Sequence, residues 1–481
     1  MARWLALGCS ATLALLALLA PVAWAHDSGF GLVRYAPDGT VDTSFGDSGS
    51  VVIRSAQRSF VANTLALQND GKVVLAGLTS DLATGTIQLA LARYNADGTP
   101  DAAFGSSGVV STSVGGAGAQ ANSVTVQPDG MLVVGGTRFG RDAPDELLVA
   151  RYTSDGALDA GFGTGGLSAT PVGAGPSSAA AIALQHDGRI IAVGTAFANG
   201  PTDDDFAVVR YTPDGQLDPT FGEDGVVTTD LTSVDAASAS LDHATALALQ
   251  PDGRIVVGGF TRGETQAFAV ARYTADGARD LTFGSRGLVK IPAREPQVSA
   301  IALQPSGTVA LAGSTASNER GAAPFALVRL RADGAPDTTF GSDGLVTTDF
   351  DGSRSGARAV VAQPDGRLIT GGAKFGAPSA SGDALPESGF ALARYNADGS
   401  LDTSFGTNGR ATSSLGDAGA VPVALAVQAD AKIVAAGLVF FQVPTSQSQT
   451  VLITPLALAA AAGLAGAISL AVLLRRVRRY R

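Results

Sequence analysis

The chain has 481 residues, of which 45% are hydrophobic, and it carries 33 Lys and Arg against 43 Asp and Glu. This length supplies ample material for a buried core, and the acidic balance argues against a nucleic-acid-binding protein, whose phosphate contacts need clustered Lys and Arg. The single cysteine, Cys9, lies near the start of the chain and excludes an internal disulfide framework.

The first 25 residues have the pattern of a secretory signal peptide. Arg3 precedes an apolar run through Leu19, and Ala23-Trp24-Ala25 offers a small-x-small cleavage site before His26. A lipoprotein signal built on Cys9 is the weaker alternative, because the apolar run follows this cysteine instead of preceding it. We therefore predict an exported chain whose mature form begins at His26 and contains no cysteine.

Residues from about 30 to 438 consist of one block repeated seven times. In each copy an Arg is followed by Asp-Gly and then by Asp, two variable residues and Phe-Gly; a second segment reads Leu-Gln-x-Asp-Gly, with a degenerate last copy at Gln428–Ala431. Self-similarity at a nearly fixed period indicates a repeat architecture. The Arg residues that mark the copies, 57 to 65 residues apart, are Arg34, Arg93, Arg151, Arg210, Arg272, Arg329 and Arg394.

Each copy predicts four short strands separated by tight turns. Short runs of Val, Ile, Leu and Ala between Pro-Asp-Gly turns favour strands over helices, because Pro presets φ and Gly accepts a positive φ. Two strands of each copy are almost continuously apolar, so both of their faces should be covered, as in the radially stacked sheets of a β-propeller. The strands predicted around the fourth copy are Phe206–Tyr211, Val226–Thr229, Ala246–Gln250 and Arg254–Gly258.

The phase of the repeat predicts how the ring closes. The first predicted strand, Phe30–Tyr35, is the third of its unit, and the last, Lys432–Leu438, is the second. A blade made from both ends of the chain would remove two exposed sheet edges. We therefore predict an all-β fold, a seven-bladed β-propeller of four-stranded blades over residues 26–440, closed by its N- and C-terminal strands; an open array of repeats is the alternative.

The repeated block reads R-Y-x-x-D-G-x-x-D-x-x-F-G-x-x-G followed by L-Q-x-D-G-x-I-x-V-x-G. It resembles the delta-60 repeat, a bacterial β-propeller repeat of secreted and surface proteins. The resemblance implies a fold and a location, and it transfers no catalytic residue. The copies depart from the pattern at Leu330 in place of Tyr, at Ser306 in place of the turn Asp and at Ala431 in place of the turn Gly, the last of which bears on the closing blade.

Residues that recur in all seven copies are better explained by structure than by catalysis. We expect the Arg of each Arg-Tyr to pair with the Asp of Asp-x-x-Phe-Gly through charge-assisted hydrogen bonds, and the Phe to be a packing anchor. The segment Gly46–Gly49 looks like a serine-protease nucleophile loop, but it occupies the same slot as Gly105–Gly108 and should be a turn. The anchors are Phe45, Phe104, Phe162, Phe221, Phe283, Phe340 and Phe405.

The links between strands two and three, and between strand four and the next strand one, vary among the copies. In a propeller these variable links emerge on one face, and variable loops on a rigid scaffold are where binding usually occurs. The acidic residues of these links mark that face as the candidate functional surface: Asp203, Asp204, Asp205, Asp349, Asp351 and Asp383.

The sequence assigns no catalytic, cofactor-binding or metal-binding residue. Of His26, His186 and His243, only His243 is expected in a variable loop, and no second His lies near it to form a zinc pair. Asp349–Ser353 resembles the start of a calcium loop, but the later ligands are missing. No cofactor is therefore expected, with calcium as the alternative.

The end of the chain predicts a membrane anchor. Residues 441–450 form a polar linker, residues 451–474 carry no charge, and five Arg lie in residues 475–481. About twenty apolar residues span a bilayer as one transmembrane helix, and a basic cluster after them marks the cytoplasmic end. The propeller would then lie outside the cytoplasm, in a bacterial cell envelope.

Together these patterns predict a non-catalytic binding scaffold for a protein or glycan of the envelope, attached to the membrane by its C-terminal helix. One alternative is a carboxylate-dependent glycan or ester hydrolase, which would need acids from different blades to converge near the ring axis. Another is a purely structural surface protein.

Overall fold

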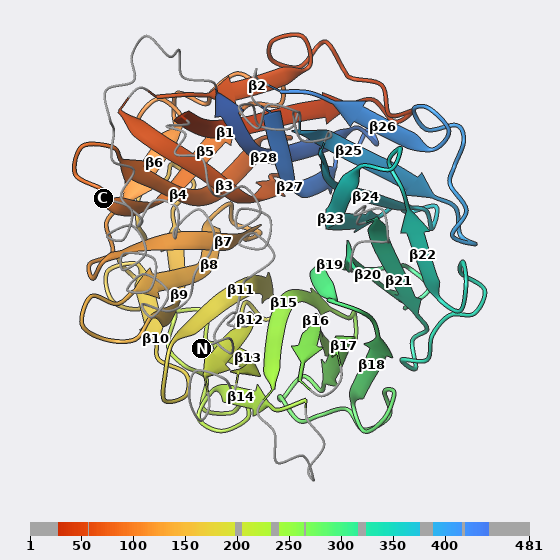
Figure 1. The fold of residues 1–481 in the computed structure, drawn as a ribbon. Helices are drawn as coiled ribbons and strands as arrows, with labels where there is room; N and C mark the ends of the chain where they lie inside the picture. Colours follow the sequence, from red (N-terminus) through yellow and green to blue (C-terminus); the bar gives the residue numbers. More distant parts are fainter. Residues whose placement is uncertain are drawn as a thin grey trace, which may run out of the picture.

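The computed structural model of the chain describes residues 27–55, 57–197, 204–231, 240–263, 266–315, 324–375, 388–415 and 419–441. These residues form 28 strands and no helix, and the strands are arranged as sheets around a common axis (Figure 1). None of the described residues belongs to a helix that could cross a membrane. The predicted signal peptide, transmembrane helix and basic tail lie outside these ranges, whereas Phe441, assigned to the linker, ends the last strand.

Each blade has four antiparallel strands, counted here from the axis outward, and a parallel bridge between Asp204 and Leu241 merges two blades into one sheet of eight strands. The innermost strands are β3 (Arg58–Leu67), β7 (Gly118–Val126), β11 (Ser177–Leu184), β15 (Leu241–Leu249), β19 (Gln297–Leu303), β23 (Arg354–Ala362) and β27 (Gly419–Val427). The second strands are β4 (Val73–Asp81), β8 (Leu132–Phe139), β12 (Ile190–Phe197), β16 (Ile255–Arg262), β20 (Val309–Ser314), β24 (Leu368–Phe375) and β28 (Ile433–Phe441).

The third strand of each sheet ends in the repeated Arg-Tyr or, once, Arg-Leu. These strands are β5 (Ile87–Tyr94), β9 (Glu146–Tyr152), β13 (Asp204–Tyr211), β17 (Gln266–Tyr273), β21 (Phe325–Leu330), β25 (Ser388–Tyr395) and β1 (Asp27–Tyr35). The short outer strands are β6 (Val109–Thr112), β10 (Leu167–Thr170), β14 (Val226–Thr229), β18 (Leu288–Pro292), β22 (Leu345–Thr348), β26 (Arg410–Ser413) and β2 (Ser50–Ile53).

The ring closes through a blade built from both ends of the chain, as the phase of the repeat predicted. We number the blades 1 to 7 from the innermost strands β3, β7, β11, β15, β19, β23 and β27. In blade 7 the strand order is β2-β1-β28-β27, and β1 pairs with β28 along its whole length, from Asp27 opposite Phe441 to Tyr35 opposite Ile433. Consecutive innermost strands contact one another all the way round, including β27 with β3.

The hydrophobic core is divided into one cluster for each pair of neighbouring blades. Between blades 3 and 4, for example, Val193 and Val208 of one sheet pack with Val257 of the next, around Phe221. The same arrangement joins blade 7 to blade 1 through Phe30, Phe45 and residues of β4. Both faces of each sheet are thus covered, which explains why the middle strands are apolar at nearly every position.

Within each blade the repeated Arg, Asp and Phe form one compact unit. The Arg Nε or Nη2 atom lies 2.6–2.9 Å from a carboxylate oxygen of the Asp, eight residues later, in all seven copies. The same guanidinium sits 4.3–4.8 Å from the ring centre of the Phe. The predicted pairing is therefore confirmed, with a cation–π contact added to it.

The same unit also links each blade to the next. The Arg210 guanidinium of blade 3 donates to the Ala275 carbonyl of blade 4 over 2.6 Å, and Gly222 N–H donates to the Asp276 carbonyl over 3.1 Å. The Gly–Asp bond recurs at all seven junctions, and Gly406 N–H to the Asp38 carbonyl closes the ring. Gly277, next to Asp276, has φ +94°, which favours glycine. A Cβ there would also come within 2.9 Å of the Phe221 ring, so the turn requires glycine for both reasons.

The tyrosine of the repeat makes a further contact between blades. Tyr211 O–H donates to the Thr170 hydroxyl of the preceding blade over 2.7 Å, and four other copies pair with a Thr or Ser hydroxyl in the same way. Where Leu330 replaces the tyrosine, the corresponding residue of the preceding blade is Ile291, which offers no hydroxyl. Leu330 therefore gives up no contact with a hydroxyl, although a tyrosine, Tyr94, is kept where the equivalent residue is Ile53.

Ala431 keeps the turn geometry of the closing blade. Its φ is +65°, and its N–H donates to the Gln428 carbonyl over 2.9 Å, as Gly253 does to Gln250. The substitution of the turn glycine therefore leaves the fold unchanged and places an alanine in the left-handed region, which costs about 1 kcal/mol.

Asp218→Ala should lower the free energy of unfolding by about 3 kcal/mol, because it leaves the buried Arg210 without its counter-ion. Asp218 has a side chain only 3% exposed and lies 2.9 Å from Arg210 and 2.7 Å from Arg189. Urea unfolding followed by circular dichroism measures the change. Asp187→Asn, which alters an exposed partner of Arg189, is the control and should cost under about 1 kcal/mol; a variant at Asp218 that unfolds like the parent would contradict the structural role.

Ala431→Gly should raise the free energy of unfolding by about 0.5–1 kcal/mol, since glycine adopts the positive φ without strain. The mirror substitution, Gly253→Ala at the same turn of blade 4, should lower it by a similar amount, because Gly253 has φ +85° and only a side chain 3.4 Å away. Thermal unfolding of the two variants beside the parent decides this. Equal melting temperatures for all three would show that the turn carries no strain.

Stability should fall steeply at acid pH. Burial opposes ionisation of Asp218, but hydrogen bonds from Thr220 together with Arg189 and Arg210 lower its pKa to about 2. Because the folded-state pKa lies below the unfolded value of about 3.9, the contribution is complete above about pH 5 and is lost as pH falls toward 2. Urea midpoints at pH 7, 5 and 3 should drop mainly between pH 5 and 3, and Asp218→Asn should show a smaller drop; an identical drop would refute this assignment.

Candidate functional site

The strand ends that the variable links join lie on one face of the ring, as predicted, and the repeated tight turns lie on the other. Of the acids that marked this face, Asp203 and Asp383 lie outside the described residues. Asp204 and Asp205 are the first residues of β13 and are both buried. They belong to a strand, two residues longer than predicted, and not to a loop.

A cluster of three carboxylates lies at the junction of blades 3 and 4. Asp205 of β13, Asp230 just after β14 and Asp242 of β15 each offer a carboxylate oxygen, and these oxygens lie within 4.8 Å of one another. The backbone brings them together: Asp204 of β13 pairs with Leu241 of β15 in a parallel bridge, so that the next residues of both strands are neighbours. We call these three residues the junction carboxylates; within the described ranges, no other group of three potential metal ligands is found.

Asp242 is the best-defined member of the junction carboxylates. Its Oδ2 atom accepts hydrogen bonds from Leu231 N–H, over 2.7 Å, and from the Ser240 hydroxyl, over 3.0 Å. Its Oδ1 atom is buried and has no hydrogen-bond partner by distance and angle, although Thr261, opposite it on β16, interacts with the carboxylate. Burial raises the pKa of Asp242. One oxygen of this side chain therefore has a structural role, and the other is left to the cluster.

A His–Asp pair lies beside the cluster, in which Asp204 is buried and the His243 side chain is 19% exposed. His243 Nε2 is 3.2 Å from Asp204 Oδ2, and the imidazole stacks on the Phe260 ring with 5.1 Å between centres. Burial lowers the pKa of His243 to about 4, and the charge of Arg262 acts in the same direction. His243 was predicted in a variable loop; instead it is the third residue of β15, because this strand begins five residues before the predicted Ala246.

The acids of the link before β23 are engaged elsewhere. Asp349 Oδ1 accepts the Gly352 N–H over 2.7 Å, and Asp351 lies 2.8 Å from the Lys374 ammonium. Both contacts use oxygens that a calcium ion would need. The partial calcium loop at Asp349–Ser353 is therefore organised as a turn closed by a lysine, and among the described residues it contributes to no metal-type cluster.

The other expectations for individual residues agree with the structure. His186 is exposed in the turn between β11 and β12, where Gly188 N–H donates to the Gln185 carbonyl. Gly46–Gly49 is a turn with Asp47 N–H bonded to the Ser50 carbonyl over 2.7 Å. Neither segment is brought near a catalytic partner in the described part of the chain.

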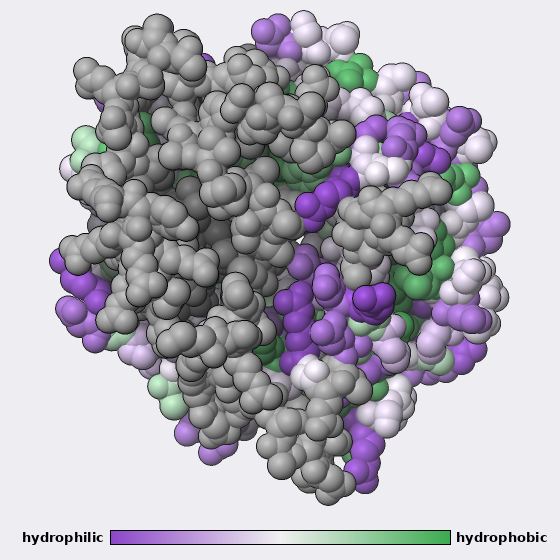
Figure 2. Space-filling model, in the orientation of Figure 1, coloured by the Kyte–Doolittle hydropathy of each residue, from purple (hydrophilic) through white to green (hydrophobic). Residues whose placement is uncertain are grey.

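The innermost strands contain little that could act on a substrate. Across the seven described innermost strands, Asp242 is the only acidic residue. Figure 2 shows hydrophilic side chains gathered near the centre of the ring beside β15 and β19, on the part of this face where residues are described. Among the described residues, the one group of three acids that meet from different blades lies at the junction of blades 3 and 4.

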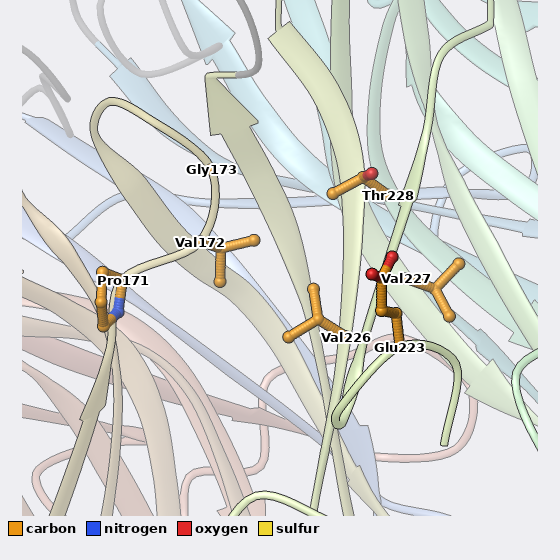
Figure 3. A pocket seen from close by; sticks show the side chains of 7 residues that line it. All are labelled: Pro171, Val172, Gly173, Glu223, Val226, Val227 and Thr228. Carbon is orange, nitrogen blue, oxygen red and sulfur yellow. The ribbon is translucent and has the colours of Figure 1, made fainter. Parts of the chain in front are cut away.

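A shallow hollow of about 480 Å³ lies between the link that joins blade 2 to blade 3 and the outer strand of blade 3, β14. Pro171, Val172 and Gly173 form one side, and Glu223 with Val226–Thr228 forms the other (Figure 3). Glu223 is the only ionisable group that lines it. A single carboxylate beside valines provides neither a paired acid and base nor a set of metal ligands.

The sequence did not single out Asp230 and Asp242, although it marked the link that contains them as variable. Their significance depends on the β-bulge that every innermost strand carries at the same place, which sets the register of the preceding residues. Comparing the seven copies position by position before the bulge would have shown the excess of acids at one junction.

Fold and repeat together define the chain as a seven-bladed β-propeller. Seven of its segments match the sequence model of the family described as "Domain of unknown function (DUF5122) beta-propeller", at residues 25–45, 68–104, 127–162, 185–221, 250–283, 304–340 and 380–405. The match supports the propeller repeat expected from the resemblance to the delta-60 repeat. It leaves out most of the four-to-one links, so that Asp230 and Asp242 fall between matched segments.

Several solved structures align with much of this chain at low sequence identity. Drosophila semaphorin 1b, extracellular domains 1-2, is 9% identical over 79% of this chain and 86% of that chain, with a TM-score of 0.40. A glucose dehydrogenase is 15% identical over 66% and 94%, with a TM-score of 0.37. The GH93 α-L-arabinofuranosidase of Fusarium graminearum is 11% identical over 69% and 92%, with a TM-score of 0.37. Among curated protein sequences no significant match is found.

Proposed function

We propose that this chain is a non-catalytic binding scaffold of a bacterial cell envelope, in which the face of variable links binds an envelope glycan or protein. The proposal rests on a difference between the two faces of the ring: one face is the same in every blade and the other varies. The turn face repeats one set of contacts seven times, whereas the link face differs at every blade. Rigid scaffolds with variable loops on one side are typical of binding proteins.

The ends of the chain support the location. The signal peptide predicted at residues 1–25 would export the propeller, and the uncharged segment 451–474 followed by five Arg would hold it at the membrane. Since β1 begins, and β28 ends, on the link side of blade 7, an anchor after residue 441 leaves from the proposed binding face.

Burial supports a non-catalytic role over the hydrolase alternative. Asp242 is fully buried and Asp205 is only 8% exposed, so neither can touch a bond in a polymeric substrate. A glycoside hydrolase needs two carboxylates that flank the scissile bond. The junction carboxylates leave only Asp230 exposed to solvent.

Exposed residues on the two faces provide a matched test. Leu82, 50% exposed in the β4–β5 link, and Arg141 in the β8–β9 link lie on the link face, whereas Leu281, 67% exposed, and Arg279 lie in a turn of the opposite face. The purified full chain should co-sediment with isolated envelope fragments. Leu82→Asp with Arg141→Glu should weaken this binding about tenfold or more, because it removes an apolar contact and reverses a charge at the binding face.

Leu281→Asp with Arg279→Glu is the control and should bind like the parent. Treating the fragments with a protease or with periodate distinguishes a protein ligand from a glycan. Equal loss of binding in both double variants, or no sedimentation of the parent, would contradict the proposal. Turnover of chromogenic glycosides or esters that disappears in Asp230→Asn would favour the hydrolase instead.

A further inference from the structure

The junction of blades 3 and 4 differs from the six others at three positions. These are the residue five before the repeated Arg, the residue twenty after that Arg at the end of the outer strand, and the residue three before the bulge of the next innermost strand. Only this junction has an acid at all three, and no other has more than one. In chain order the triplets are Gly29, Arg54, Phe60; Gln88, Ser113, Ala119; Glu146, Pro171, Ser177; Asp205, Asp230, Asp242; Ala267, Pro292, Pro296; Pro324, Asp349, Ser355; and Gly389, Ser414, Ala420.

The fold itself does not require a carboxylate at Asp242. At the preceding junction Ser177 occupies the same position, and its hydroxyl accepts the Val172 N–H over 3.2 Å, just as Asp242 Oδ2 accepts the Leu231 N–H. One hydroxyl oxygen therefore satisfies the local backbone. Asp242 adds a second oxygen, Oδ1, which is buried without a hydrogen-bond partner. A buried acceptor left unsatisfied costs about 1–3 kcal/mol, so its presence needs another explanation.

The spacing of the three carboxylates fits a calcium ion. Calcium binds oxygen ligands at about 2.3–2.6 Å, so two ligands on opposite sides of the ion are about 4.6–5.2 Å apart. The oxygens of Asp205, Asp230 and Asp242 lie within 4.8 Å of one another and can all reach one such ion. Magnesium takes ligands at about 2.0–2.1 Å in a strict octahedron and keeps several of its waters, so a site made of three protein carboxylates favours calcium.

The three carboxylates outnumber the basic side chains beside them. Two basic side chains are near: the Lys290 ammonium donates to the Leu231 carbonyl, and the Arg262 guanidinium lies over the Phe260 ring, 4.8 Å from its centre. Like charges that share a partly buried site repel one another, and a bound divalent cation reverses that cost. The exposed Asp230 leaves an entry from solvent.

We propose that Asp205, Asp230 and Asp242 form a calcium-binding site that joins blade 3 to blade 4. The ion takes one oxygen from each of the three carboxylates, with Asp242 contributing Oδ1 while Oδ2 holds the backbone of the link. The site ties two blades that a parallel bridge between β13 and β15 also joins, the one such bridge between blades among the described residues. This inference does not depend on the proposed binding function, because its test uses the metal alone.

The experiment uses the purified full chain, stripped with a chelator and titrated with CaCl2 by isothermal calorimetry. We expect one Ca²⁺ per chain with a dissociation constant on the order of 10⁻⁴ M, as in other extracellular sites, and weaker binding of Mg²⁺. Calcium at 5–10 mM, an excess chosen on that order-of-magnitude affinity, should raise the melting temperature relative to chelator.

Three variants copy residues that other junctions carry at the same positions: Asp205→Gln, Asp230→Ser and Asp242→Ser. Each should weaken Ca²⁺ binding about tenfold or more, because each removes a charged ligand. Asp242→Ser retains a hydroxyl for the Leu231 N–H, and in chelator all three should melt at or above the parent, since repulsion is relieved. Asp349→Ser, the same position as Asp230 at another junction, should bind Ca²⁺ like the parent.

Several results would overturn the site. They are the absence of calcium-dependent heat and of a melting shift in the parent, unchanged calcium binding in Asp205→Gln and Asp242→Ser, and an equal loss in Asp349→Ser. Tighter binding of Mg²⁺ than of Ca²⁺ would overturn the assignment to calcium. If Asp205→Gln or Asp242→Ser melts below the parent in chelator, the calcium binding of Asp230→Ser decides the question, because its exposed side chain can be removed without opening the core.

Discussion

The contact between the repeated Arg, Asp and Phe is the constraint on which the rest of this structure depends. One guanidinium, such as that of Arg210, pairs with the aspartate of its own blade, stacks on its own phenylalanine and donates to a carbonyl of the next blade. Because a planar, permanently charged group can do all three at once, the same side chain fixes both the return between two strands and the angle between two sheets. Seven such units, each about 60 residues apart, join every blade to the next, and the last blade is completed by strands from both ends of the chain.

The repeated contacts between Arg, Asp and Phe limit where a ligand can bind. The repeated polar residues are occupied by contacts within and between blades, so any ligand must be met by residues that the repeat leaves variable. The link face provides these, and the rigid blades hold its residues in place. At the junction of blades 3 and 4 the parallel bridge between Asp204 and Leu241 brings a third strand and an innermost strand into register. Acids that are 25 and 12 residues apart in the chain thereby converge.

The junction carboxylates conflict with the local physics of the fold, and such conflicts tend to mark functional sites. Ser177 shows that an uncharged side chain satisfies the same backbone group. The burial of Asp242, the orphaned Oδ1 atom and the proximity of two further acids all raise the cost of the apo state. A divalent cation would offset the repulsion by binding the three carboxylates. It would also cross-link two blades in a propeller that has no cysteine for a disulfide.

Sequence by itself determined the number of blades, the strands and the closure, because a seven-fold repeat with complementary half-units has one economical arrangement; it also identified the Arg–Asp pairing from recurrence alone. It did not determine where β13 and β15 begin, since Asp204 and Leu241 extend into segments that look like loops until a parallel bridge pairs them. For the same reason Asp205 was marked while Asp230 and Asp242 were passed over. Only the tertiary structure decided which acids meet, because the distance between blades is set by the contacts between sheets and not by the spacing of residues along the chain.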